Sequence, residues 1–223
     1  MRVEWFGQSA FRLEADGVRV MVDPFADLTP LRGRGRRWEY PPIPVEPADL
    51  LLVTHEHLDH NGVEAVAGEP RVVRSTAGFF ADTPVGEVVA VASEHDDVAG
   101  TARGPNALIA FSLGGLRVAH LGDLGQRALR PEQLAALGHV DLLLAPVGGG
   151  PTIGAEQAWE VARQVGAQLV VPMHYRTERI DFLEPVDDFA ARAPRVERLP
   201  ESWFETAALP HGEGPLAVVP AVP

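Results

Sequence analysis

The stretch Leu50–Asn61 constrains this chain more than any other. Four apolar residues, Leu50 to Val53, are typical of a short buried strand, and His55-Glu56-His57-Leu58-Asp59-His60 follows after one threonine. Imidazole and carboxylate groups are the usual nitrogen and oxygen ligands of zinc and similar divalent metals. Because alternate side chains of an extended segment point the same way, His55 and His57 can reach one metal, while Asp59 and His60 can reach a second. A solvated polar loop is the alternative, and so dense a set of ligand-type residues makes it the weaker interpretation.

The composition indicates a globular protein with an acidic surface. The 223 residues suffice for one large domain, 1–223, and the hydrophobic content of 46% supports a substantial core. The net charge of −12 disfavours extended nucleic acid or an anionic membrane as a partner. Because the chain has no cysteine, His, Asp and Glu must supply any metal ligands. No apolar run has the length of a signal core or a membrane span, so we expect a cytoplasmic protein.

The order of elements predicts an α/β fold with sheets inside and helices outside. Strands come first along the chain, and strand–helix–strand units follow in the second half. We also expect Ser75-Thr76 to cap a helix that runs through Phe80. The remaining expected strands are 2–6, 10–14, 18–22, 71–74, 87–92, 107–113, 116–120, 141–145, 168–171 and 216–219, and the expected helices are 63–66, 131–137, 155–165 and 186–191.

Four further strand ends carry a histidine or an aspartate. His95, Asp123 and His174 each follow an apolar run. A lone histidine at such a place is more often structural, but beside the cluster at 55–60 it indicates a metal ligand. Asp23 follows the strand that ends at Val22. It is either a turn former or a carboxylate that orients a metal-bound histidine, and the sequence leaves both open.

The segment 24–48 is rich in proline, glycine and arginine and shows no periodicity. Long loops of this kind often serve as lids. The arginines between 32 and 37, together with Trp38 and Tyr40, are candidates for holding an anionic substrate. A solvated flap, or a contact surface in a homo-oligomer, is the interpretation that the residues favour.

The chain resembles the metallo-β-lactamase superfamily, a four-layer αββα fold with two metals at one edge of a sheet sandwich. The segment 55–60 matches the family's His-x-His-x-Asp-His signature in full, and the later residues follow in the family's order. The closer resemblance is to the branch that contains L-ascorbate-6-phosphate lactonase. The marks of that branch are the segments 5–11, 23–24, 103–106, 120–123, 146–150 and 172–175. The branch commonly has histidine after Gly7, where this chain has Gln8, and no role is transferred to Gln8.

The resemblance implies a complete ligand set for two metals. His55, His57 and His95 would bind the first ion, Asp59, His60 and His174 would bind the second, and Asp123 would bridge them. Zinc is the preferred ion, with manganese and iron as alternatives. Asp59 is also the candidate catalytic residue, because it can take a proton from the attacking water.

The expected activity is a metal-dependent hydrolysis in which metal-bound hydroxide attacks a small, anionic lactone or another ester-like molecule. The candidates for substrate contact are Arg103, Asn106 and Gly149. Two alternatives stay open. One is a phosphodiesterase acting on nucleotides or RNA, and the other is a non-catalytic metal-binding or assembly protein.

Overall fold

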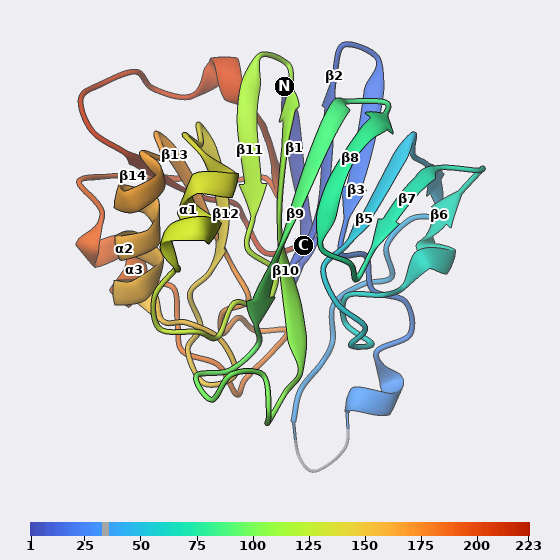
Figure 1. Cartoon of the computed structure of the whole chain (residues 1–223). Coiled ribbons are helices and arrows are strands. Elements are labelled where there is room, and N and C mark those ends of the chain that lie inside the picture. Colours follow the sequence, from blue (N-terminus) through green and yellow to red (C-terminus); the bar gives the residue numbers. More distant parts are fainter. Residues whose placement is uncertain (33–35) are drawn as a thin grey trace.

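Two large mixed sheets face each other in the computed structural model, which describes residues 1–32 and 36–223 (Figure 1). The six-stranded sheet has the order β15-β1-β2-β3-β5-β7, and the eight-stranded sheet has the order β14-β16-β13-β12-β11-β10-β9-β8. The expected α/β class, with two mixed sheets inside, is confirmed. The strands are β1 (Arg2–Gly7), β2 (Ala10–Ala15), β3 (Val18–Val22), β4 (Glu46–Pro47), β5 (Leu50–Val53), β6 (Val66–Ala67), β7 (Arg71–Arg74), β8 (Gly78–Thr83), β9 (Gly86–Glu94), β10 (Pro105–Leu113), β11 (Leu116–His120), β12 (Leu142–Pro146), β13 (Leu169–Met173), β14 (Arg195–Arg198), β15 (Trp203–Glu205) and β16 (Leu216–Val219).

Strand β5 explains why its apolar run is continuous. It lies between β3 and β7 and is parallel to both. Leu50 and Leu52 point into the hydrophobic core between the two sheets. Leu51 and Val53 point the other way, into a second hydrophobic cluster on the outer face of the six-stranded sheet. Because both faces are covered, an alternating polar pattern would leave buried polar groups, and only apolar residues fit.

The two outer layers differ. The helices α1 (Pro131–Leu137), α2 (Ala155–Val165) and α3 (Asp187–Arg192) cover the eight-stranded sheet (Figure 1). On the six-stranded sheet, the cover comes largely from the segment 24–48. The residues that this segment contributes to the outer hydrophobic cluster are Phe25, Leu28, Trp38, Tyr40 and Ile43. Within the described ranges this side carries only the short 3₁₀ helices Thr29–Leu31 and Val63–Ala65. Much of the expected flap is therefore packed structure, and its movement as a lid stays a prediction.

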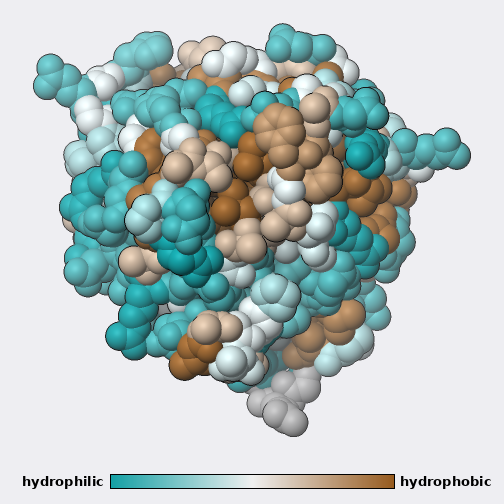
Figure 2. Space-filling model, viewed as in Figure 1, coloured by the Kyte–Doolittle hydropathy of each residue, from teal (hydrophilic) through white to brown (hydrophobic). Residues whose placement is uncertain are grey.

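The predicted helix at 75–80 is wrong. Ser75 has a φ of +47°, outside the helical region, and Gly78–Thr83 forms β8, the edge strand that pairs with β9. The β propensity of Phe79 and Phe80 and the pairing with β9 outweigh the capping signal of Ser75. Phe79 is 63% exposed on this edge. Figure 2 shows hydrophobic residues gathered on the same face, beyond the area that the helices cover.

No helix among the described residues is long and apolar enough to cross a membrane.

Candidate metal centre

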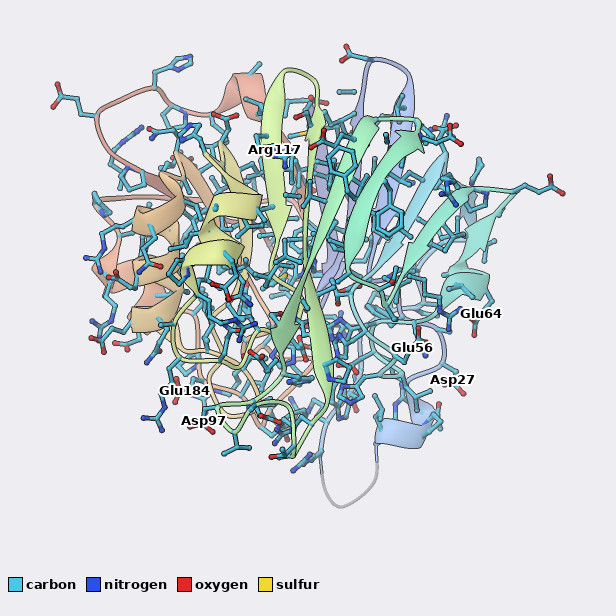
Figure 3. The ribbon with its side chains drawn as sticks, in the orientation of Figure 1. Asp27, Glu56, Glu64, Asp97, Arg117 and Glu184 are labelled. Carbon is cyan, nitrogen blue, oxygen red and sulfur yellow. The ribbon has the colours of Figure 1, made fainter. Side chains whose placement is uncertain are left out.

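The sheet topology brings the strand ends that carry histidine and aspartate to one edge of the molecule. Strands β9 and β11 are both antiparallel to β10, so they run the same way, and β13 runs parallel to them through β12. His95, Asp123 and His174 follow the ends of these three strands. The segment 55–60 approaches from β5 of the other sheet. In Figure 3, Glu56, Asp97 and Glu184 lie along this lower edge, whereas Arg117 lies toward the opposite end.

The first ligand cluster consists of His55, His57 and His95. One ring nitrogen from each lies within 4.8 Å of the others. His55 Nε2 and His57 Nδ1 are 3.0 Å apart, so both point at the same position. His95 Nδ1 donates to the carbonyl oxygen of Pro151 at 3.1 Å, and this bond leaves Nε2 to face the cluster with its lone pair. Three imidazole nitrogens that lie this close together are a donor set that suits zinc.

Asp123 joins this cluster to a second one. Asp59, His60 and Asp123 also offer ligand atoms within 4.8 Å of one another. The Oδ1 atom of Asp123 lies 3.2 Å from His60 Nε2. Its Oδ2 atom lies 3.1 Å from His95 Nε2 and 3.3 Å from His174 Nε2. One carboxylate thus contacts histidines of both clusters, and all of the expected ligands meet at this edge.

Asp23 fixes the orientation of two of these histidines. Its carboxylate accepts hydrogen bonds from the Thr54 amide at 2.7 Å, from the Thr54 hydroxyl at 2.6 Å and from His60 Nδ1 at 2.8 Å. The Thr54 oxygen lies 3.0 Å from His55 Nδ1. A carboxylate can only accept, so His60 must carry its proton on Nδ1, which turns the Nε2 lone pair toward Asp59 and Asp123. Asp23 therefore occupies the position of an orienting carboxylate.

Histidines and carboxylates lie close together at the centre and shift one another's pKa values. Burial opposes protonation of His60, but the carboxylates of Asp123, Asp59 and Asp23 outweigh it and raise the pKa of His60 well above its usual value. Burial also opposes ionisation of Asp123, yet His174 and His60 hold the pKa of that carboxyl well below its usual range. Burial and the neighbouring histidines lower the pKa of His55. Among the described residues His60 Nε2 is buried without a hydrogen-bond donor or acceptor in good geometry. A ring nitrogen held in this way beside carboxylates fits a divalent cation, which would replace the proton on Nε2 and take over its balance of the negative charge.

Gln8 belongs to the centre, and the sequence assigned it no role. Its side-chain Nε2 atom donates to Asp59 Oδ2 at 3.2 Å, and its backbone carbonyl oxygen accepts from the backbone amide of His174 at 3.2 Å. Gln8, Asp23 and His174 have φ values of +47°, +45° and +50°. Such left-handed backbone in non-glycine residues clusters at functional sites. The Gly-x-Ser turn after β1 was the available signal, but it does not reveal which strand end the turn meets.

The expected substrate contacts meet different outcomes. The amide of Asn106 donates to Ser93 Oγ at 2.8 Å and to the Leu121 carbonyl at 2.9 Å, and its oxygen accepts from the Asp123 amide at 3.0 Å. These bonds hold the Asp123 loop. Asn106 also lines the cavity of about 320 Å³ that adjoins the cleft, and its contact with substrate stays a prediction. Gly149 lies beside a neighbouring hollow of about 420 Å³, whereas Gly150 lines the cleft over the metal ligands. Arg103 lines that cleft, and its contact with substrate stays a prediction.

The cleft over the ligands has a volume of about 630 Å³. Metal-ligand candidates form its floor, and apolar side chains together with two arginines form its walls. An adjoining cavity of about 320 Å³ shares Glu56, His57 and Arg103 with it. Of the arginines expected at the flap, Arg36 lines the cleft. The side chains of Arg32 and Arg37 instead donate to the backbone carbonyl oxygens of Trp38 and Glu178. Arg34 lies outside the described residues. The residues of the walls are Leu31, Arg36, Trp38, Leu58, Arg103 and Phe182.

Comparisons with known proteins agree with this geometry. Residues 2–174 match the family model described as a β-lactamase superfamily domain. A UPF0173 metal-dependent hydrolase of Salinibacter ruber is 34% identical over 200 residues, which is 79% of this chain and 85% of that protein. One of Methylobacterium nodulans is 32% identical over 208 residues, which is 78% of this chain and 85% of that protein.

A solved structure from Thermotoga maritima has the same fold throughout. It is provisionally described as a Zn-dependent hydrolase of the metallo-β-lactamase superfamily. It is 32% identical, its TM-score is 0.78, and the match covers 98% of each chain. The family match and these relatives oppose the alternative of a non-catalytic assembly protein. The chain therefore belongs to the metallo-β-lactamase superfamily, as one of its metal-dependent hydrolases.

Proposed function

We propose that this protein hydrolyses a lactone or a similar small ester at a dinuclear metal site, as members of the lactonase branch that it resembles would. The observation that carries the proposal is the position of Asp123, whose two carboxylate oxygens contact histidines of both ligand clusters. Two divalent ions held there would lower the pKa of a shared water and polarise the carbonyl that is attacked. Zinc suits the His/Asp donor set best, and manganese and iron are alternatives.

The side chains of the chain itself would orient the reaction. Asp59 lies at the floor of the cleft and is held by Gln8 at 3.2 Å, so its carboxylate would receive the proton of the attacking water in a fixed direction. Asn106 holds the backbone amide of Asp123. Asp23 keeps His60 in the tautomer that offers Nε2. The apolar walls of the cleft would exclude bulk water around the ester bond.

Metal content and turnover together test the proposal. Purified protein should contain about two equivalents of divalent metal per chain, and lactone hydrolysis should stop when a chelator removes them. His57→Ala should lower kcat/KM, and the decrease should correspond to a loss of at least about several kcal/mol of transition-state stabilisation, on the scale of metal effects. His139→Ala is the matched control, because His139 is exposed and pairs with Asp141 away from the ligand clusters. Metal-free protein that keeps full turnover, or equal rates in the two variants, would refute the assignment.

A phosphodiesterase is the second candidate, and Arg36 is the observation that favours it. This guanidinium lines the cleft. It could bind an oxygen of the phosphodiester that the metals do not bind, or a further phosphate of the same substrate. The other described flap arginines, Arg32 and Arg37, bond to carbonyl oxygens and do not extend a basic surface for RNA. Turnover of phosphodiesters that exceeds turnover of every lactone tested would favour this candidate.

A further inference from the structure

Two arginines in the wall of the cleft lack the partners that most other arginines of this chain have. Arg12, Arg74, Arg127, Arg130 and Arg198, for example, each pair with a carboxylate. In the part of the chain that the structure describes, the side chains of Arg36 and Arg103 form neither a salt bridge nor a hydrogen bond. Both are cations on a protein whose net charge is −12. The cleft over the expected metal ligands therefore contains two guanidinium groups that no described side chain neutralises.

The backbone that carries Arg103 is held rigidly. The Asp96 carboxylate accepts hydrogen bonds from the backbone amides of Val98, Gly100, Ala102 and Arg103, at 2.7 to 3.0 Å. This loop also packs against the Asp123 loop, since a Cβ on Gly125 would lie 2.5 Å from the Asp96 amide nitrogen. A closely packed loop of this kind presents Arg103 at a fixed distance from the proposed metals, while the side chain stays free to bind.

Arg36 is held in a different way. Its guanidinium carbon lies 4.8 Å from the centre of the Phe182 ring, within the range of a cation–π contact. Phe182 in turn packs against Trp38, with ring centroids 5.0 Å apart. Stacking on an aromatic face leaves the N–H groups at the edge of the guanidinium available for an oxyanion.

The acidic groups of the cleft are already engaged. Glu56 lines it, but both of its oxygens bind Arg74, at 2.8 and 2.6 Å. Asp59 and Asp123 are the proposed metal ligands. Among the described residues that line the cleft, no carboxylate is therefore left over to neutralise either arginine, and a bound substrate can take that place. The apolar wall made by Leu31, Trp38, Leu58 and Phe182 favours a carbon skeleton over a fully hydrated sugar chain.

We propose that Arg36 and Arg103 recognise an oxyanion, a carboxylate or a phosphate, on a substrate whose apolar body lies against Trp38 and Phe182. This inference rests on the proposed function, since it names the class of ester that the metal site would hydrolyse. A charge-assisted hydrogen bond to a guanidinium inside a cleft corresponds to about a ten- to hundredfold preference for the charged molecule.

Three lactones that share the same ring and differ only in one side group test the preference in the zinc-loaded protein. One carries a carboxylate, one a phosphate and one a neutral carboxamide. The wild type should prefer at least one of the charged lactones about tenfold or more in kcat/KM, and the charged group it prefers names the oxyanion. Arg103→Gln and Arg36→Gln should each reduce that preference, chiefly through KM. Arg127→Gln, which changes an exposed arginine paired with Asp97 outside the cleft walls, should preserve it. Equal turnover of the three lactones, or an unchanged preference in both cleft variants, would overturn the inference.

A binding measurement separates this inference from the proposed function. Trp38 lines the cleft, so its fluorescence should change when benzoate binds to zinc-loaded protein. Benzoate should bind about tenfold more weakly to Arg103→Gln and to Arg36→Gln than to the wild type or to Arg127→Gln. This pattern without any lactone hydrolysis would support the oxyanion site and refute the lactonase. Equal benzoate binding by all variants would refute the oxyanion site, whatever the turnover.

Discussion

The Asp23→Asn substitution tests whether one buried carboxylate sets the orientation of ligands for both metals. The asparagine oxygen can still accept from the Thr54 amide, and its NH₂ group can donate to the Thr54 hydroxyl. That NH₂ group then faces His60 Nδ1, which donates to Asp23 at 2.8 Å. Two donors cannot pair, so His60 would have to move its proton to Nε2, the nitrogen that faces Asp59 and Asp123.

The expected size of the effect follows from the bonds that are lost. Each hydrogen bond to the charged group is worth about 1.5–3 kcal/mol. Loss of a carboxylate behind a metal-binding histidine lowers metal affinity by about 10- to 100-fold, or about 1.4–2.7 kcal/mol. Because Thr54 links Asp23 to His55 Nδ1 at 3.0 Å, both metal positions should weaken, the His60 side more strongly.

Competitive titration with a chromophoric chelator measures the two affinities, and a thermal melt of the metal-free protein reports any separate loss of stability. Thr54→Val is the matched control. It removes the hydroxyl between Asp23 and His55 but keeps the direct bond from His60, so the first cluster alone should weaken. If Asp23→Asn binds two metals as tightly as the wild type, or if both variants give the same profile, Asp23 does not orient the ligands as described.

Three further predictions concern separate parts of the molecule. His174→Ala should lower the bound metal from about two equivalents to about one, because the first cluster does not use His174; elemental analysis that still finds two would contradict this. Gly148→Ala should lower the stability by about 1–3 kcal/mol, since the added Cβ would lie 2.1 Å from the His174 carbonyl oxygen; an unchanged melting temperature would show that the loop yields easily. The chain has two tyrosines, and burial raises the pKa of Tyr40 to about 12 and also raises that of Tyr175. A tyrosine whose pKa is raised on folding stabilises the fold below its unfolded value near 10 and loses that contribution as the pH rises toward 12. Tyrosinate absorbance should therefore be absent near pH 10 in the native protein, and a normal titration there would refute the burial of both rings.

The strands and the ligand-type residues of the site could be predicted from the sequence, because both are recognised from short stretches of the chain. The apolar run at 50–53 and the six residues at 55–60 stand next to each other in the chain, and His95, Asp123 and His174 each follow a recognisable strand. The family resemblance then supplied which of them belong together. The expected helix at 75–80 failed because a nonlocal partner, β9, determines the conformation of that segment.

What the sequence missed depends on contacts between distant segments. Gln8 meets Asp59 across 51 positions, and only the folded sheets bring them within 3.2 Å. Asn106 was expected to contact substrate because it stands in the Arg-Gly-Pro-Asn segment. The sequence did not reveal that its side-chain oxygen also accepts a hydrogen bond from the Asp123 amide. The strands β14 and β15 were not predicted, because they are short, partly exposed and formed only by pairing with β16 and β1. The sequence around Gln8, around Asn106 and in these two strands contains no local pattern that identifies their contacts.

The expected ligands come from both sheets: 55–60 follows a strand of the six-stranded sheet, and His95, Asp123 and His174 follow strands of the eight-stranded sheet. Ions bound at this edge would link the two layers in addition to the hydrophobic core. A ligand that binds only the folded chain stabilises it in proportion to the logarithm of its concentration over its Kd. Separation of the sheets would then require release of metal, and the protein's resistance to proteolysis would follow the metal supply. We therefore expect metal limitation to shorten the lifetime of the protein as well as to stop its turnover.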